Sequence, residues 1–298
     1  MEPPTAAAAA DARPGGAWQS TLSCQELAAV TGVGFAQVGQ VFGVAVYAAD
    51  SASGSACPAA RASAVGGTPA VSTPGGFEAL VAAMYEARRT AIDRMTAQCA
   101  ALDGHGVVAV RLSSDTFEFG RLEATVAGTA VRAPHSVPAL EATRRADAGG
   151  PRFPFACAAS GQDFARLIRT GWVPVGLALG IAMGARHDDL TTTRQVRPWA
   201  RNAEVAGWTE LVNGVRRDAR RRMEQDVQRL GAEGVVTADM QMRVRQRDCP
   251  VAVGRHDHIV EVTFLGTAIA GFSTSNHPHA AAPLTIMPLG ETCTGFVG

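Results

Sequence analysis

The stretch that decides the fold reads QELAAVTGVGFAQVGQVFGVAV at residues 25–46, and it recurs as QDFARLIRTGWVPVGLALGIAM at residues 162–183. At this spacing of 137 positions the identical pairs include Gln25/Gln162, Gly34/Gly171, Val38/Val175, Gly39/Gly176 and Gly43/Gly180. Two more blocks repeat in the same order: Arg88-Arg89, Arg94-Met95 and Gly106-Val107-Val108 recur 128 positions later, and Glu123-x-Thr125-x-x-Gly128-Thr129-Ala130 recurs 138 positions later. Ordered matches with small changes of offset are produced by insertions between fixed elements. The sequence therefore predicts a duplicated domain.

Each copy opens with a helix start signal. Ser23-x-x-Glu26 forms a capping box in the first copy, and Ser160-x-x-Asp163 takes the same place in the second. A short helix is predicted after each signal. It stops at Gly34 or Gly171, because glycine accepts the positive φ found at the ends of many helices.

Strands and one long helix follow in both copies. First strands are predicted at residues 35–47 and 172–183, and long helices run to Leu102 and Leu230 with apolar residues at helical spacing. Two further strands are expected in each copy, at residues 106–112 and 122–131 and at residues 235–244 and 259–269. Glycines inside the first strands indicate a bulge or a close backbone approach. The predicted fold class is α+β: two tandem β-α-β-β two-layer domains, each preceded by a short helix.

The duplication divides the 298-residue chain into five parts. Residues 1–19, rich in proline, alanine and glycine, are expected to be a disordered leader. The first domain is placed at residues 20–134, a linker at 135–153, the second domain at 154–272 and an extended tail at 273–298. Each domain is long enough to bury a core of its own.

Composition excludes several classes of protein. With 27 basic and 27 acidic residues the net charge is zero, so no overall field favours nucleic acid. No window approaches the roughly 20 apolar residues of a membrane helix. The leader lacks the leucine-rich stretch of a secretory signal, and the six cysteines do not recur between copies. We therefore expect a cytoplasmic protein with reduced thiols, no nucleic-acid partner and no membrane partner.

The repeated residues resemble a known family. A helix with Glu86-Ala87-Arg88, a turn from Leu102 into Gly106-Val107-Val108 and a closing Gly128-Thr129-Ala130-Val131 strand are similar to the YbjQ family, whose members carry a heavy-metal-binding label. The second copy shows the same pattern, and the tandem form is similar to actinobacterial members. The resemblance implies a dodecin-like subunit fold and ring-like homo-oligomers, often pentameric. It implies no catalytic residues.

Assembly is also expected from the architecture alone. A three-stranded sheet covered by one helix leaves a sheet face and two strand edges open, and open edges pair with other chains. We expect a homo-oligomer, with the apolar-leaning tail residues 282–298 as a possible docking segment for another protein.

The strongest metal candidate is the insertion between the last two strands of the second copy, residues 245–258. It holds Cys249, His256 and His258, and thiolate and imidazole are ligands for zinc and other divalent heavy metals. His256 and His258 alternate toward one face of a strand and supply two ligands, so the third comes from Cys249 or from another segment. An ordinary polar loop is the competing interpretation.

Other candidates have weaker support. His277-Pro278-His279 lacks anything to fix its geometry, and His187-Asp188-Asp189 offers carboxylates to a hard cation but is typical of a solvated turn. The arginines at 216, 217, 220, 221 and 222 are interrupted by acidic residues and predict ion pairs along a helix face. Cys99 fits a core position, and Cys57 is the expected exposed thiol.

Three functions remain open at this point. The first is a non-enzymatic intracellular oligomeric binding protein for a heavy metal or a small ligand held at subunit interfaces. The second is a ring-forming scaffold that binds other proteins. The third is an enzyme with a pocket between subunits, which is disfavoured because no nucleophile elbow, phosphate-binding glycine loop or repeated carboxylate pair is present in a fitting context.

Overall fold

The computed structural model describes residues 19–48, 77–117, 121–133, 154–196, 202–249 and 255–271. The predicted linker, the predicted tail and all of the leader except Gln19 lie outside these residues. The candidates Cys57, His277 and His279 lie outside them as well.

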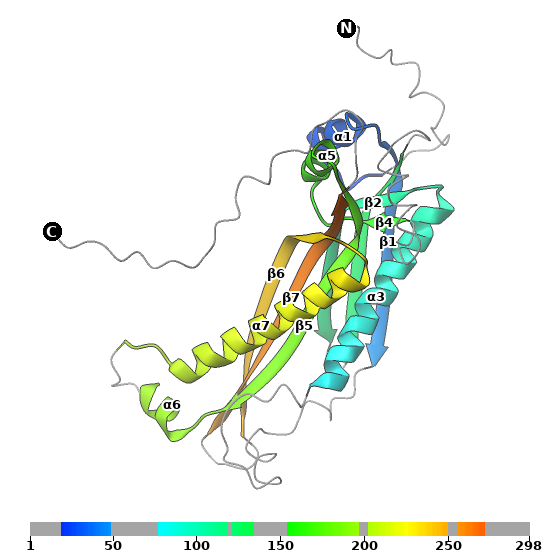
Figure 1. Cartoon of the computed structure of the whole chain (residues 1–298). Coiled ribbons are helices and arrows are strands. Elements are labelled where there is room, and N and C mark those ends of the chain that lie inside the picture. The colour runs from blue at the N-terminus through cyan, green and yellow to red at the C-terminus, as the bar shows by residue number, and fades with distance from the viewer. Residues whose placement is uncertain are drawn as a thin grey trace, which may run out of the picture.

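The first copy folds into a helix-prefixed β-α-β-β module (Figure 1). Its elements are α1 (Cys24–Thr31), β1 (Ala36–Ala48), α3 (Glu78–Ala101), β2 (Gly106–Phe117) and β3 (Arg121–Arg132). The strands form an antiparallel sheet in the order β1-β3-β2, with α3 across one face. A fourth short strand, β4 (Phe155–Ala156), pairs in parallel with β2 although it follows the predicted linker. The first sheet therefore includes residues from the start of the second copy.

The second copy repeats the same plan (Figure 1). Its elements are α5 (Gly161–Arg169), β5 (Trp172–His187), α6 (Leu190–Gln195), α7 (Ala206–Arg229), β6 (Gly234–Asp248) and β7 (His256–Gly271). The strands form an antiparallel sheet in the order β5-β7-β6. This arrangement confirms the predicted α+β class with two tandem two-layer modules. Helix α6 has no counterpart in the sequence-based expectation.

The irregularities of the two sheets also repeat. The β1–β3 register shifts between Gln37 and Gly39, and the β5–β7 register shifts between Pro174 and Gly176, which are equivalent positions. The β2–β3 and β6–β7 registers likewise shift at equivalent places, after Val108 and after Thr237. Bulges are fixed structural features of a fold. The two modules therefore share their bulge positions as well as their strand order.

The predicted helix start and turn residues act as expected. Ser23 Oγ accepts from Glu26 N at 3.3 Å, and Glu26 Oε2 accepts from Ser23 N at 2.9 Å. The bond from the Ser23 backbone N–H is the main cause that lowers the pKa of Glu26. Gly34 and Gly171 have φ values of 89° and 84°, which glycine adopts without strain.

The hairpin of the second copy is longer than the sequence suggested. Strand β6 continues to Asp248 and β7 begins at His256, so both ends of the segment 245–258 lie in strands. The error arose because the end of β6 is a run of charged and polar residues. These are compatible with an exposed edge strand, which needs no apolar alternation.

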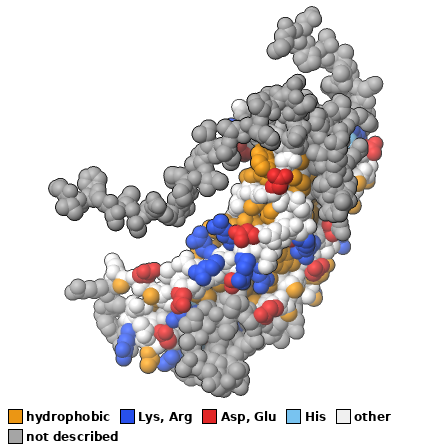
Figure 2. Space-filling view, in the orientation of Figure 1, with side chains coloured by type: hydrophobic (Ala, Val, Ile, Leu, Met, Phe, Trp, Pro, Cys, Tyr) orange, Lys and Arg blue, Asp and Glu red, His pale blue; other side chains and the backbone are white. Residues whose placement is uncertain are grey.

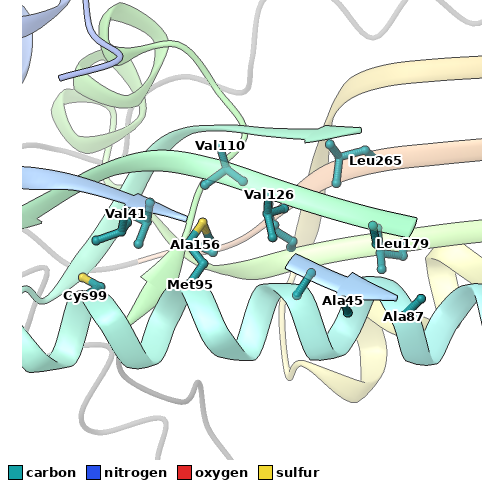
Figure 3. Packing of buried hydrophobic residues seen from close by; sticks show 14 of the residues in the cluster. Val41, Ala45, Ala87, Met95, Cys99, Val110, Val126, Ala156, Leu179 and Leu265 are labelled. Carbon is teal, nitrogen blue, oxygen red and sulfur yellow. The ribbon is translucent and has the colours of Figure 1, made fainter. Parts of the chain in front are cut away.

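The two modules share one core. Leu177, Leu179 and Leu265 of the second sheet belong to the same buried cluster as Met95 of α3 and Val126 of β3 (Figure 3). A second shared cluster joins Ile181 and Met183 of β5 to the start of α3. The face of the second sheet that points away from α7 is therefore covered by the first module.

The short helices α1 and α5 pack against each other at the end of the shared core opposite the start of α3 (Figure 1). Gln162 Nε2 of α5 donates to Gln25 Oε1 of α1 at 3.3 Å, and Gly161 N donates to Glu26 Oε1 at 3.2 Å. Gln25 and Gln162 are equivalent residues of the two copies. None of the helices in the described ranges is long and apolar enough to cross a membrane.

Cysteine reactivity should follow burial. Cys99 and Cys157 are fully buried, and burial raises the pKa of the Cys99 thiol to about 12 and that of the Cys157 thiol to about 11. Both are therefore protonated at neutral pH, and only the thiolate is nucleophilic. We expect iodoacetamide to modify the exposed Cys24 in the native protein and to modify Cys99 and Cys157 only after unfolding. Peptide mapping by mass spectrometry checks this; rapid native labelling of Cys99 would show that the core is open.

Candidate metal centre

Three potential metal ligands meet at the end of the second sheet that carries α6. They are His187 at the end of β5, Cys249 just after β6 and Asp257 near the start of β7. One ligand atom from each residue lies within 4.8 Å of the other two, and all three residues are buried. Among the described residues, no other group of three or more His, Cys, Asp or Glu side chains has its ligand atoms within this distance of one another.

Strand register brings these residues together. His187 is the direct partner of Asp257 across β5 and β7, and Asp257 is the direct partner of Arg247 across β7 and β6. Direct partners point their side chains to the same face of a sheet. Cys249 follows the last pair of β6 and is fixed by a bond from its N–H to Arg255 O at 2.9 Å. The hairpin that extends beyond the first copy's length thus positions two of the three residues.

The Asp257 carboxylate already has two nitrogen-bearing neighbours. His187 Nδ1 lies 2.9 Å from Asp257 Oδ1, and Arg247 Nε lies 3.3 Å from Asp257 Oδ2. Asp257 has no exposed surface, so its negative charge is stabilised by these neighbours rather than by water. A metal ion would replace part of this pairing through one carboxylate oxygen.

The donor set fits a divalent heavy metal. One imidazole nitrogen, one thiolate and one carboxylate make a mixed set of the type that zinc accepts, and three protein ligands leave a fourth position open. Ligand atoms bound to tetrahedral zinc lie about 3.3–3.8 Å apart. The separations of up to 4.8 Å would close by about 1 Å around an ion.

A second polar cluster lies on the other side of the same strand ends. His258 Nε2 lies 3.1 Å from Asp188 Oδ2, and Trp208 Nε1 donates to Asp188 Oδ1 at 3.1 Å. The Trp208 and His258 rings lie 4.3 Å apart between centroids. Asp188 N also donates to His256 O at 3.0 Å. This cluster connects the start of α7 to β7, and its hydrogen bond to Asp188 occupies Nε2 of His258.

The sequence-based candidates are separated by the fold. Cys249 joins the group of three ligands, whereas His258 faces Asp188 and His256 Nδ1 lies 3.1 Å from the exposed carboxylate of Asp248. Strand alternation explains the division, because residue 257 points to the opposite face from residues 256 and 258. His187 was named from the sequence only as part of the separate hard-cation candidate, and Asp257 was not proposed. Sequence reasoning could have found the pair by aligning β5 with β7 at the repeated glycines and continuing that register to the ends of the two strands.

The three polar residues at the end of β5 take three different roles. His187 joins the ligand group and Asp188 joins the Trp208 cluster. Asp189 caps α6, where its carboxylate accepts from Thr192 N at 2.7 Å, and this bond is the main cause that lowers its pKa. The sequence-based alternative of a hard-cation site would need these carboxylates together, whereas the structure directs Asp188 and Asp189 to separate partners.

Comparison with known proteins agrees with this architecture. A family model described as "Putative heavy-metal-binding" (YbjQ_1) matches residues 36–134, which run from β1 to the end of β3. The chain is also 33% identical over 225 residues to the encapsulin nanocompartment protein Rv1762c of Mycobacterium tuberculosis strain H37Rv, covering 73% of this chain and 75% of that protein. The chain belongs to the YbjQ family. In this YbjQ-family protein the residues matched by the family model form the first module, whereas the candidate metal ligands lie in the second.

Proposed function

We propose that this YbjQ-family chain is a non-enzymatic, self-assembling cytoplasmic protein that holds a divalent heavy metal ion, such as zinc, at His187, Cys249 and Asp257. The observation that supports metal binding most strongly is the convergence of three different ligand types from three strand ends within 4.8 Å of one another. The family description supports the same class of ligand. The fourth position would be taken by water or by a ligand from outside the chain.

A zinc titration of metal-free protein tests the proposal. We expect one zinc ion per chain, and we expect His187→Ala and Cys249→Ser each to weaken zinc binding by about 100-fold, because each removes a direct ligand. Binding should also weaken as the pH falls, since the ligands bind metal in their deprotonated forms. Circular dichroism of each variant confirms that it remains folded.

His258→Ala is the discriminating control. It removes a residue of the sequence-based ligand set but leaves His187, Cys249 and Asp257 in place. Zinc affinity within threefold of the unmodified protein is expected for His258→Ala. If His187→Ala bound zinc as tightly as the unmodified protein while His258→Ala did not, the ligands would instead be those suggested by the sequence.

Self-assembly is supported by an asymmetry between the two modules. Leu179 and Met183 of β5 are 1% and 9% exposed, whereas the equivalent Phe42 and Val46 of β1 are 55% and 58% exposed. Both pairs lie on the sheet face that points away from the long helix. We name Phe42, Val44 and Val46 the open face. The first module covers this face of the second sheet, and within the described residues no element covers it in the first.

The surface that could cover the open face also exists twice. In the first module, Leu112 of β2 packs against the cluster that holds Leu177, Leu179 and Leu265. Its equivalent in the second module is Met240 of β6, which is exposed together with Met242 and Val244. We name Met240, Met242 and Val244 the open edge. We propose that the open edge of one chain covers the open face of the next, as the first module already covers the second.

Such a contact is heterologous, because two different surfaces meet. Repeated contacts of this type close into a ring or continue as a filament. We propose a closed ring with a pentamer as the expected form, because the resemblance to the YbjQ family implies rings. The name of the M. tuberculosis relative denotes a nanocompartment protein. Light scattering during size-exclusion chromatography tests assembly: several chains per particle are expected, and a 30.9 kDa particle at all concentrations would contradict it.

A further inference from the structure

A cleft of about 590 Å³ separates the long helices of the two modules. Its lining comes from both: Tyr85 and Arg89 of α3, and Arg221, Arg222, Gln225, Asp226 and Arg229 of α7. Figure 2 shows basic side chains gathered near the middle of the visible face of the molecule, over α7. Sites for small ligands have volumes of about 300–1,000 Å³. The cleft is therefore large enough for a small molecule.

The cleft carries an excess of positive charge. Four arginines line it against a single carboxylate, Asp226. That carboxylate is occupied: Asp226 Oδ2 accepts from Leu179 N at 2.9 Å, while Oδ1 pairs with Arg229 and lies 3.4 Å from Arg89 Nη2. Asp226 thus accepts a hydrogen bond from the backbone of the edge strand β5. The equivalent residue of the first module, Gln98, accepts from Phe42 N of β1 through Oε1 at 3.0 Å. Its primary role is structural, and it offsets only part of the arginine charge.

Two of the arginines have unused hydrogen-bonding capacity. Arg222 makes no ion pair or hydrogen bond to any described residue, and the buried Nε of Arg89 has no hydrogen-bond partner among those residues either. Arg89 is nevertheless held in place by its contact over the Tyr85 ring, 5.2 Å from the centroid. Positioned guanidinium groups of this kind bind phosphate through paired N–H donors.

Two of the four arginines occur in one copy alone, whereas Arg222 corresponds to Arg94 and Arg89 to Arg217. The residues of α3 equivalent to Arg221, Gln225 and Arg229 are Asp93, Ala97 and Ala101. The first module folds in the same way without them. Arg221 and Arg229 therefore add positive charge where the second helix faces the first module, and the equivalent surface of the first module lacks these two residues.

We propose that this cleft binds a small molecule carrying a phosphate or pyrophosphate group. Arg89 from the first module and Arg222 from the second would contact the same anion, so binding would link the two modules. This site is separate from the metal ligands and involves none of their residues. It gives the protein a second ligand of a different chemical class.

Calorimetric titration with inorganic pyrophosphate tests the proposal. Metal-free His187→Ala protein in low-salt, phosphate-free buffer is used, because pyrophosphate would chelate a bound metal ion. One pyrophosphate per chain is expected, and Arg222→Gln and Arg89→Gln should each weaken binding by about tenfold, as expected for loss of a charged hydrogen bond. Zinc binding in the parent protein should be unaffected by Arg222→Gln, which separates failure of this site from failure of the metal centre.

Arg220→Gln provides the matched control. Arg220 lies on the same helix but outside the cleft, and its Nε pairs with Glu224 Oε1 at 3.1 Å on the exposed face. Its loss should change pyrophosphate affinity less than twofold. The proposal would be overturned by an absence of binding, by equal weakening in Arg220→Gln, or by affinity that grows with the length of an added oligonucleotide, since the last two results indicate a diffuse basic surface.

Discussion

Gly43→Ala and Gly180→Ala should each lower the free energy of unfolding by about 3 kcal/mol or more, because overpacking against rigid backbone cannot relax. A Cβ at Gly43 would collide with the carbonyl oxygen of Ala91 on α3, and one at Gly180 would collide with that of Ala219 on α7. The obstacles are helix backbone atoms, so the helix would have to lift from the sheet. Chemical denaturation followed by circular dichroism measures the loss, and the double variant should not reach a stable native state.

Neighbouring glycines in the same strands give the control. A Cβ at Gly39 would meet only Leu102 Cδ1 at 3.6 Å, and one at Gly176 would meet Leu230 Cδ2 at 3.4 Å. These are ordinary contacts with flexible side chains. Gly39→Ala and Gly176→Ala should therefore cost less than about 1 kcal/mol. Equal losses at all four positions would mean that strand propensity, and not helix contact, determines the effect.

A glutamate introduced at equivalent positions of the two copies should destabilise the fold in one copy and not in the other. Leu179→Glu places a carboxylate in the core shared by the modules and should destabilise the fold by several kcal/mol, which is about the cost of burying an unpaired charge. Phe42→Glu changes the equivalent residue on the open face and should leave the chain folded. Thermal unfolding measured by circular dichroism compares the two variants directly.

The second consequence of Phe42→Glu concerns assembly. Combined with Val46→Glu it places two charges on the open face, and the number of chains per particle should fall to one. Leu190→Glu changes a similarly exposed apolar residue, on α6 and outside both proposed surfaces, and should leave the particle size unchanged. Assembly that survives Phe42→Glu/Val46→Glu would show that another surface joins the chains.

The repeated residues predicted most of the architecture. Gly43 and Gly180 indicated close packing in both first strands, and the helix contacts now provide the reason. The predicted long helix in the first copy ends within one residue of the observed end at Ala101. Such features are local, because caps, helical periodicity and glycine positions are encoded by neighbouring residues.

The parts that sequence reasoning missed depend on contacts between distant segments. The pairing of β4 with β2 joins residues on either side of the predicted linker, and no local sequence pattern predicts this pairing. At the metal centre, Cys249 was selected by its residue type, but His187 and Asp257 become neighbours only through the β5–β7 register. The charged residues after Val244 concealed the extension of β6, which brings Cys249 beside the start of β7.

The most direct test of the account is to mix two blocked variants and measure the mass of the particles by native mass spectrometry. One variant carries Phe42→Glu/Val46→Glu and retains its open edge; the other carries Met240→Glu/Met242→Glu and retains its open face. Each alone should be a single chain of about 30.9 kDa, and the mixture should form particles of two chains and none larger, because only one intact joint can form. If the mixture remained single chains, or if either variant assembled alone, the proposed head-to-tail joining of modules would be contradicted.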